Sequence, residues 1–440
     1  MNEKILFYIW LSSSIFAGSK TPKILLEHFG EIEKIYHAEK KDFEELGITY
    51  PDIAALCNKN LDNAKRYYEY CKANRIGILC YDDPFYPERL KIIENPPPMF
   101  YYKGTVRQLD DFPCLTMVGT RSCSEKGFRL AYESGFEAAS KGAVIVNGLA
   151  KGIDGACIAG ALDANGYAIG LLGCGIDRVY PYENKDLFDR LCATGLILTE
   201  FPPFSKPDKT HFPTRNRVMS ALSLATVIFE ADAGSGALIT AKHALAQGRR
   251  IFAVPGKPYD KSYSGPLELI KDGASIFTEA DDVLSEYSMS FPHRINLAND
   301  NKAPQDKLDA YVARFFKKGT DPDTPVNRRF TKLFEKKEKT AVEKVPKEHT
   351  SKLTDNVKNE TENSASTPAK TDVGKISPDL SLLSPEERAI YDILFTNGSM
   401  TPDEISCHGI KIEDILAAIT LLEIYGVVTA LPGGKYEAVK

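Results

Sequence analysis

The sequence lacks most of the short motifs that identify common enzyme classes. It contains no GxxxxGK[ST] phosphate-binding loop, no GxSxG nucleophile elbow, no HExxH zinc pair and no carboxylate dyad. Its seven histidines are scattered, and none of its nine cysteines forms a CxxC pair. We therefore expect no catalytic centre, no cofactor and no metal site, and we expect the cysteines to be buried free thiols in a reducing cytoplasm.

Long hydrophobic runs are also absent, and no segment approaches the ~20 apolar residues of a membrane span. Residues 1–20 have the outline of a signal peptide, with Lys4 before an apolar run. However, Glu3 lies in the charged region and the apolar run is short. We expect this segment to be the first helix of the mature protein, without a membrane partner.

No strong excess of either charge is present, because 55 Lys and Arg face 60 Asp and Glu, for a net charge of −5. This balance argues against a wholly basic nucleic-acid coat but leaves room for a local basic patch.

The chain is long enough for two or three domains. Residues 1–75 have helical spacing of apolar side chains. Residues 293–380 are polar, charged and poor in large apolar residues, which predicts a disordered linker. Residues 381–440 have the pattern of three helices followed by a hairpin, with its turn at 432–434, which is typical of a winged helix.

Residues 76–292 have the pattern of an α/β domain. We predict strands at 114–118, 143–147, 168–172, 196–200, 225–230, 251–254 and 275–278, and helices at 125–141, 153–165, 184–194, 237–248 and 266–271. Near-continuous apolar strands separated by amphipathic helices predict a doubly wound, Rossmann-like parallel sheet with helices on both faces. Ligands of such sheets bind at the carboxyl ends of the strands.

Charged and glycine-rich turns follow these strands. The first strand is followed by VGTRSCSEKG, in which Arg121 and Ser122 suit a phosphate, although an exposed turn explains them equally well. The second is followed by Lys151, a plausible phosphate contact, and by Asp154, which we expect to cap a helix. After the third strand, Tyr180 can either stack on a base or pack around a proline, and so can Tyr182.

The segment FPPFSKPDKTHFPTRNR after the fourth strand alternates basic and aromatic residues, including Lys209. Basic residues interleaved with aromatic rings suit a sugar-phosphate backbone with bases to stack. Arg215 and Arg217 flank Asn216, and a Gly-Ser-Gly turn with Ser235 and Gly236 opens the helix after the fifth strand. A glycine turn at a helix start, near guanidinium groups, predicts an anion site.

Together these segments resemble the DNA-processing protein A family (DprA, also called Smf). VGTRSCSEKG, NGLAKGIDGACIAGAL, TEFPPF, HFPTRNRVMSALS, EADAGSGALITAKHALAQGR and FAVPG follow one another in family order. The resemblance implies an extended Rossmann fold with an N-terminal helical domain similar to SAM or helix-hairpin-helix modules, and a winged-helix tail.

The resemblance also implies a function. It is that of a cytoplasmic homodimer that binds single-stranded DNA and helps load the RecA recombinase during natural transformation. The DNA-binding residues that we predict from the residue patterns and the resemblance together are Arg121, Ser122, Lys151, Lys209, Arg215, Asn216, Arg217, Ser235 and Gly236.

Two alternatives stay open from the residues alone. The same type of sheet carries nucleotide phosphoribohydrolases, for which Glu200 or Glu230 would supply a catalytic carboxylate. The C-terminal segment could read duplex DNA, but its third helix is apolar and acidic, which favours a protein contact.

Overall fold

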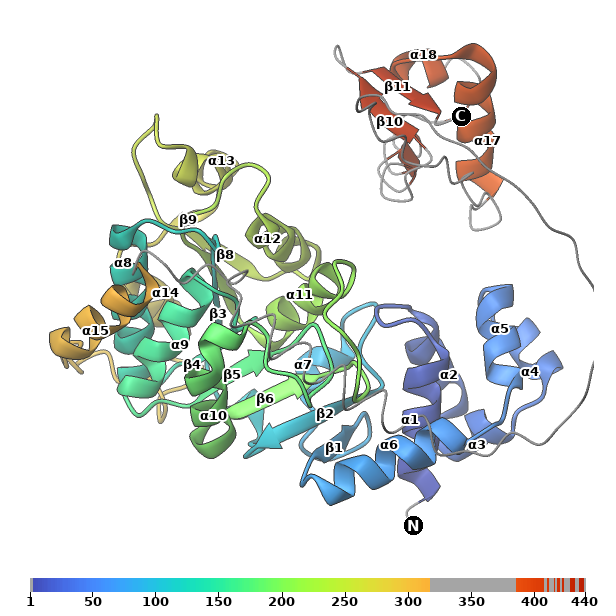
Figure 1. The fold of residues 1–440 in the computed structure, drawn as a ribbon, viewed down its shortest axis with the longest axis horizontal. Helices are drawn as coiled ribbons and strands as arrows, with labels where there is room; N and C mark the ends of the chain where they lie inside the picture. Colours follow the sequence, from blue (N-terminus) through green and yellow to red (C-terminus); the bar gives the residue numbers. More distant parts are fainter. Residues whose placement is uncertain are drawn as a thin grey trace, which may run out of the picture. The chain divides into compact units, whose positions relative to one another are not determined.

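The computed structural model describes residues 3–316 and, in the C-terminal part, residues 385–406, 410, 415, 418–419, 422, 428–431 and 435–438. The chain divides into two compact units, Met1–Lys339 and Thr340–Lys440. Figure 1 draws both units as ribbons.

The first unit begins with short helices, as the apolar spacing predicts. They are α1 (Glu3–Ser14), α2 (Thr21–Phe29), α3 (Ile32–His37), α4 (Lys40–Glu44), α5 (Tyr50–Cys57) and α6 (Asp62–Ala73). Leu6, Ile9 and Leu11 of α1 are buried, so the predicted first helix is part of the core. Helices α1 and α6 pack against the first strand of the sheet (Figure 1).

A nine-stranded sheet forms the centre of this unit. Its strands are β1 (Gly77–Cys80), β2 (Met99–Gly104), β3 (Cys114–Val118), β4 (Val144–Asn147), β5 (Ala168–Leu171), β6 (Leu196–Thr199), β7 (Ala225–Ile228), β8 (Arg250–Ala253) and β9 (Ser275–Ile276). Their spatial order is β1-β2-β6-β5-β4-β3-β7-β8-β9. The pairs β1–β2 and β2–β6 are antiparallel, and the other neighbouring pairs are parallel.

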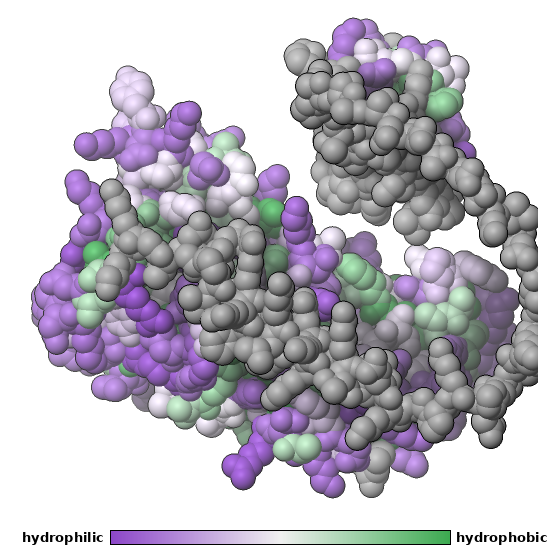
Figure 2. Space-filling model, in the orientation of Figure 1, coloured by the Kyte–Doolittle hydropathy of each residue, from purple (hydrophilic) through white to green (hydrophobic). Residues whose placement is uncertain are grey.

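Helices cover both faces of the sheet. They are α7 (Glu88–Lys91), α8 (Glu125–Ser140), α9 (Ile153–Asp163), α10 (Lys185–Thr194), α11 (His211–Leu222), α12 (Gly236–Ala246), α13 (Ser264–Lys271), α14 (Asp281–Tyr287) and α15 (Gln305–Phe315). Leu115 and Met117 join one apolar cluster with α8 and α9, whereas Cys114 and Val118 join a second cluster with α11 and α12. Hydrophilic side chains predominate on the solvent side of α8 and α15 in Figure 2.

The strand order places a topological switch point in the middle of the sheet. From β3 the chain proceeds outward through β4, β5 and β6, and then returns to β7, which pairs with the other side of β3. In open α/β sheets, ligands bind in the crevice that this reversal leaves at the carboxyl ends of the strands. The ends of β3 and β7 are therefore the expected position of a site.

All seven predicted core strands and all five predicted helices of the α/β region are present, with small shifts at their ends. Strand β1 and helix α11 were not predicted. The linker prediction for 293–380 is wrong over Gln305–Phe315, because these residues form α15 and bury Leu308 and Val312. Residues 317–380 of that prediction lie outside the described residues.

The C-terminal unit contains α17 (Pro385–Asn397), α18 (Pro402–Ser406) and the antiparallel strands β10 (Val428–Leu431) and β11 (Lys435–Ala438). Ile390, Leu394, Ile405 and Leu422 form its small apolar core. The predicted hairpin turn at 432–434 and most of the predicted third helix lie outside the described residues.

Close packing of α8 on α9 generates a prediction about Gly160. A Cβ at this position would overlap the carbonyl oxygen of Tyr132 and approach the amide nitrogen of Phe136 to 2.8 Å. Overpacking costs about 1–3 kcal/mol, which exceeds the gain of about 1 kcal/mol from replacing a helical glycine with alanine. We expect Gly160→Ala to lower the midpoint of urea unfolding.

The matched control is Gly236→Ala at the start of α12, where no described atom lies within 4 Å of the added Cβ. This variant should keep or raise the midpoint. Equal stability of the two variants would contradict the close contact between α8 and α9.

Candidate nucleic-acid interface

Loops at the carboxyl ends of the strands form one continuous edge of the sheet. We call it the strand-end surface and define it by residues 119–124 after β3, 148–152 after β4, 172–182 after β5, 200–212 after β6 and 230–236 after β7. Every predicted DNA-binding residue lies in these loops or in the first two turns of α11 and α12.

Arg121 is exposed at the end of β3, beside the switch point. Its guanidinium group lies 5.1 Å from the ring centre of Phe212, and the Tyr180 ring lies 5.6 Å from Phe212. Tyr180 is 38% exposed, so it pairs with Phe212 while keeping part of its ring accessible. A cation beside one ring of an aromatic pair can hold a phosphate while the rings receive a base.

Gly152 fixes the loop after β4 against the loop after β3. Its φ of +85° is in the left-handed region, and a Cβ there would meet the carbonyl oxygens of Thr120 and Arg121 at 2.5 and 2.8 Å. Glycine is therefore required on both grounds. The close approach places Lys151, which is partly exposed, in the loop next to Arg121.

Arg215 and Arg217 do not lie on the surface, although the sequence predicts them as phosphate contacts. They lie in the second turn of α11, where they are 5% and 2% exposed. The neighbouring Asn216 is 8% exposed. The RNR segment is thus part of a buried helix under the strand-end surface.

Arg217 is held by a buried ion pair. Its two terminal nitrogens donate to Oε1 and Oε2 of Glu200, at the end of β6, over 2.7 and 2.8 Å. Its Nε donates to the carbonyl oxygen of Asn95 over 3.1 Å. Because both carboxylate oxygens and all three guanidinium nitrogens are engaged, the pair fastens α11 to β6.

The buried charge of Arg215 is less completely compensated than that of Arg217. It donates to the Leu171 carbonyl, while its buried Nε has no hydrogen-bond partner among the described residues. Burial lowers the pKa of Arg215 to about 10. The positive charge of Arg121 adds to this shift, whereas the negative charge of Asp154 opposes it. A cation held under Arg121 therefore adds to the positive potential there.

Three carboxylates lie beneath the same surface, and each has partners. Glu200 binds Arg217. Glu230, 1% exposed, accepts hydrogen bonds from the backbone N–H and hydroxyl of Ser124, and from the Tyr263 hydroxyl over 3.3 Å. Ser124 also caps α8, so Glu230 fixes the turn that carries Arg121.

The prediction that Asp154 caps a helix is wrong: it lies in the first turn of α9, whose N-cap is Gly152. Its carboxylate instead accepts from the Gly148 N–H over 3.0 Å and so fastens the loop before the helix. Burial raises the pKa of Asp154, while Arg215 and the backbone donors lower it.

The remaining predicted residues are distributed along the surface. Ser235 caps α12 by accepting from the Ala237 N–H, and Asn216 donates to the Gly236 carbonyl over 3.3 Å, so α11 and the Gly-Ser-Gly turn are brought together. Lys209 is exposed near the start of α11. Several exposed cations in or beside the strand-end surface have no ion pair among the described residues. They include Arg121, Lys206, Lys209, Lys257 and Lys261.

The eight cysteines described are free, and no group of three or more metal-binding side chains is present in the part of the chain that the structure describes. Burial raises the pKa of several of these thiols, including Cys123 and Cys174, to about 12. No helix among the described residues is long and apolar enough to cross a bilayer.

Comparison with known proteins extends these observations. The family model of DNA recombination-mediator protein A matches residues 77–288. Protein Smf of Synechocystis sp. is 35% identical over 289 residues, which are 64% of this chain and 73% of that protein. DNA processing protein DprA of Bacillus subtilis is 41% identical over 201 residues, which are 46% of this chain and 68% of that protein.

A solved structure also matches. DNA processing protein A from Streptococcus pneumoniae aligns with a TM-score of 0.56 and 31% identity, over 63% of this chain and 95% of that chain. The matched family region, residues 77–288, contains the whole strand-end surface.

The buried pair generates a prediction about stability. Removing one partner of a buried ion pair leaves an uncompensated charge and costs about 3–5 kcal/mol. We expect Arg217→Gln and Glu200→Gln each to lower the free energy of unfolding by this amount, and the double variant to lose less than the sum. Urea unfolding of the four proteins measures the cycle.

The exposed pair Arg250–Glu286, at 2.9 Å, is the control. The same substitutions there should cost less than about 1 kcal/mol, because exposed pairs contribute little. If Arg217→Gln kept full stability, the guanidinium group would instead be available to a ligand.

Proposed function

Because the chain belongs to the DNA recombination-mediator protein A family, also called DprA or Smf, we propose that it binds single-stranded DNA along the strand-end surface and passes it to the RecA recombinase. In this proposal the protein protects incoming DNA during natural transformation and acts in the cytoplasm.

One observation carries the proposal: Arg121 lies beside the Phe212 ring, which in turn packs against Tyr180, at the switch point of the sheet. Phosphates need accessible cations, and unpaired bases need accessible aromatic faces. Duplex DNA would present its phosphates but keep its bases stacked inside, so the rings favour a single strand.

The electrostatics support the same ligand. Among the described residues, the exposed cations of the strand-end surface that have no ion pair attract a polyanion. The buried Arg215 adds a positive charge that the field of Asp154 opposes but that no ion pair in this part of the chain cancels. Among the predicted DNA-binding residues, we assign phosphate contacts to Arg121, Lys151 and Lys209. Ser122, Ser235 and Gly236 offer hydroxyl or backbone groups to the DNA. Arg215, Asn216 and Arg217 lie beneath the surface and affect binding indirectly, without contacting the DNA.

The phosphoribohydrolase alternative finds less support. A catalytic carboxylate must reach its substrate, but Glu200 and Glu230 are buried and occupied by Arg217 and by Ser124 with Tyr263. We therefore propose a binding protein without a catalytic step, metal or cofactor.

The flanking parts have roles in this proposal too. We propose that the N-terminal helices form a SAM-like or helix-hairpin-helix-like module, and that the C-terminal unit is a winged helix that contacts protein rather than a DNA groove. We further propose a homodimer, as the family resemblance implies.

The exposed arginine generates the first functional prediction. Arg121→Ala should weaken binding of a single-stranded oligonucleotide about tenfold and flatten the slope of log affinity against log salt by about 0.7, because one phosphate contact is lost. Fluorescence anisotropy over a salt series measures both quantities.

Arg250→Ala is the matched control, since Arg250 is exposed at the beginning of β8, on the opposite edge of the sheet. It should leave the slope unchanged. Equal effects of the two variants would mean that binding depends on overall charge rather than on the strand-end surface.

The aromatic pair generates a second prediction. Phe212→Leu should lower affinity for single-stranded DNA about fivefold, since losing one stacked base costs about 1 kcal/mol, but it should keep the salt slope of the wild type. Phe85→Leu, at an exposed phenylalanine outside the surface, is the control. A changed slope in Phe212→Leu would show that the ring acts by positioning Arg121.

A further inference from the structure

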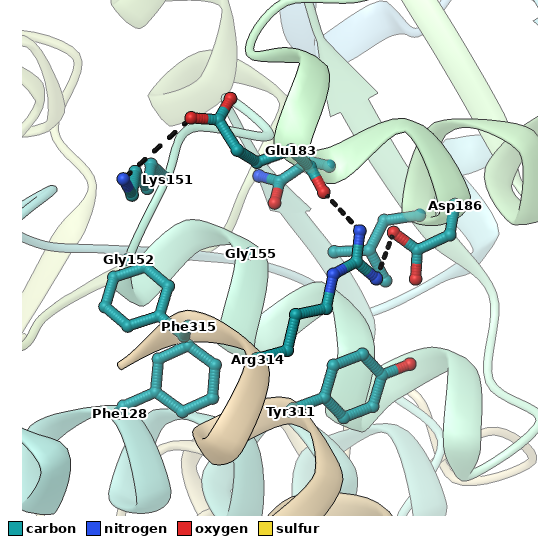
Figure 3. A pocket seen from close by; sticks show the side chains of 11 residues that line it. Phe128, Lys151, Gly152, Gly155, Glu183, Asp186, Tyr311, Arg314 and Phe315 are labelled. Atoms are coloured by element: carbon teal, nitrogen blue, oxygen red, sulfur yellow. Dashed lines mark hydrogen bonds and ion pairs between the residues drawn. The ribbon is translucent and has the colours of Figure 1, made fainter. Parts of the chain in front are cut away.

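A pocket of about 260 Å³ lies between α15 and the helices α8, α9 and α10. We call it the α15 pocket and show its lining in Figure 3. Its walls include Phe128 of α8, Tyr311 and Phe315 of α15, and Asn184 before α10, and its floor includes Gly155 of α9. The matched family region ends at residue 288, so α15 adds this pocket to the family domain.

Aromatic rings form one side of the pocket. The ring centres of Phe128 and Phe315 are 4.9 Å apart, and the Lys151 ammonium group lies 5.7 Å from the Phe315 ring (Figure 3). The Tyr311 hydroxyl accepts from Arg190 over 2.7 Å, which fixes the orientation of its ring. Such a wall suits a flat, aromatic ligand.

A fixed hydrogen-bond acceptor, Asn184, also lines the pocket. Asn184 donates its amide hydrogens to the Leu149 and Ala150 carbonyls, over 3.0 and 2.9 Å. This assigns the amide orientation and leaves Oδ1, which has no donor among the described residues, as an acceptor for a ligand. Gly155 leaves space beside it, since a Cβ there would lie 3.1 Å from the Asn184 amide nitrogen.

The charges around the pocket balance. Lys151 lies 3.9 Å from Glu183, and Arg314 reaches across the pocket to Asp186 at 3.0 Å and to the Glu183 carbonyl at 2.8 Å (Figure 3). Two cations and two carboxylates give no net charge, so the pocket favours a neutral ring with polar edges over a phosphate. Its volume is just below the usual range of about 300–1,000 Å³ for ligand sites, which suits one ring system.

The pocket adjoins the strand-end surface through two residues. Lys151 and Gly152 line it, and Gly152 lies so close to the loop after β3 that an added Cβ would meet the carbonyl oxygens of Thr120 and Arg121. A polynucleotide whose phosphate lies at Arg121 therefore passes close to the pocket mouth.

We propose that the α15 pocket binds a nucleobase, stacked on Phe315 with a donor edge at Asn184 Oδ1. For a base in a DNA strand this rests on the proposed function, whereas a free nucleotide would present the same chemistry. The pocket then holds one base of the strand apart from its neighbours.

The test uses the full-length protein and oligonucleotides that each carry 2-aminopurine at one position. One position should be quenched on binding, because stacking on an aromatic ring quenches this base. Phe315→Ala should remove most of that quenching and weaken strand binding about fivefold. Gly155→Ala should do the same by narrowing the floor while every aromatic ring stays. Phe85→Ala, outside the pocket, should change neither quantity.

A parallel titration with 2-aminopurine nucleoside monophosphate separates the two sources of the base. Quenching that depends on Phe315 in either titration supports the pocket, and the titration that shows it identifies the source. If strands bind with normal salt dependence but no quenching depends on Phe315 or Gly155, the pocket proposal fails while the proposed function stands. If wild-type protein binds no strand, the proposed function fails, and the nucleotide titration alone decides for or against the pocket.

Discussion

A charge buried under the strand ends needs an opposite charge beside it, and the bidentate pair between Glu200 and Arg217 meets this requirement. The pair joins the end of β6 to α11, and α11 also packs against β3 and contacts the Gly-Ser-Gly turn through Asn216. Because Arg217 is fully engaged, α11 cannot shift without exposing an unpaired carboxylate. The strand-end surface therefore rests on a rigid polar layer, and the exposed side chains above it are presented in a fixed arrangement.

The arginines of this region divide into two groups by burial. Arg215 and Arg217 lie beneath the surface, and Arg121 lies on it. Arg217 stabilises the fold, whereas Arg215 keeps a buried nitrogen that has no partner among the described residues and contributes positive potential from below. In the proposed function, substituting a buried arginine would weaken DNA binding by disturbing the fold. Substituting Arg121 would weaken it by removing a direct contact with the DNA.

The sequence predicted the parallel sheet well, because strands such as 114–118 and 144–147 are continuous apolar runs between amphipathic helices. It did not predict helix α11, because Pro213 and two arginines in its first turns have the composition of a loop, and their partner Glu200 lies on another element. Helix α15 was missed because its apolar residues, among them Leu308 and Phe315, lie in a long polar segment. Ion pairs between residues that are far apart in the sequence allow basic side chains to be buried, and local sequence patterns do not reveal such pairs.

In the proposed function, single-stranded DNA lies along one edge of the sheet, and hydrogen exchange measured with and without a single-stranded oligonucleotide tests this most directly. We expect the oligonucleotide to slow exchange in residues 119–124 after β3 and 204–212 before and at the start of α11. The opposite edge, around the beginning of β8, should exchange at the same rate in both samples. Protection confined to the N-terminal helices or to the C-terminal unit would contradict the account.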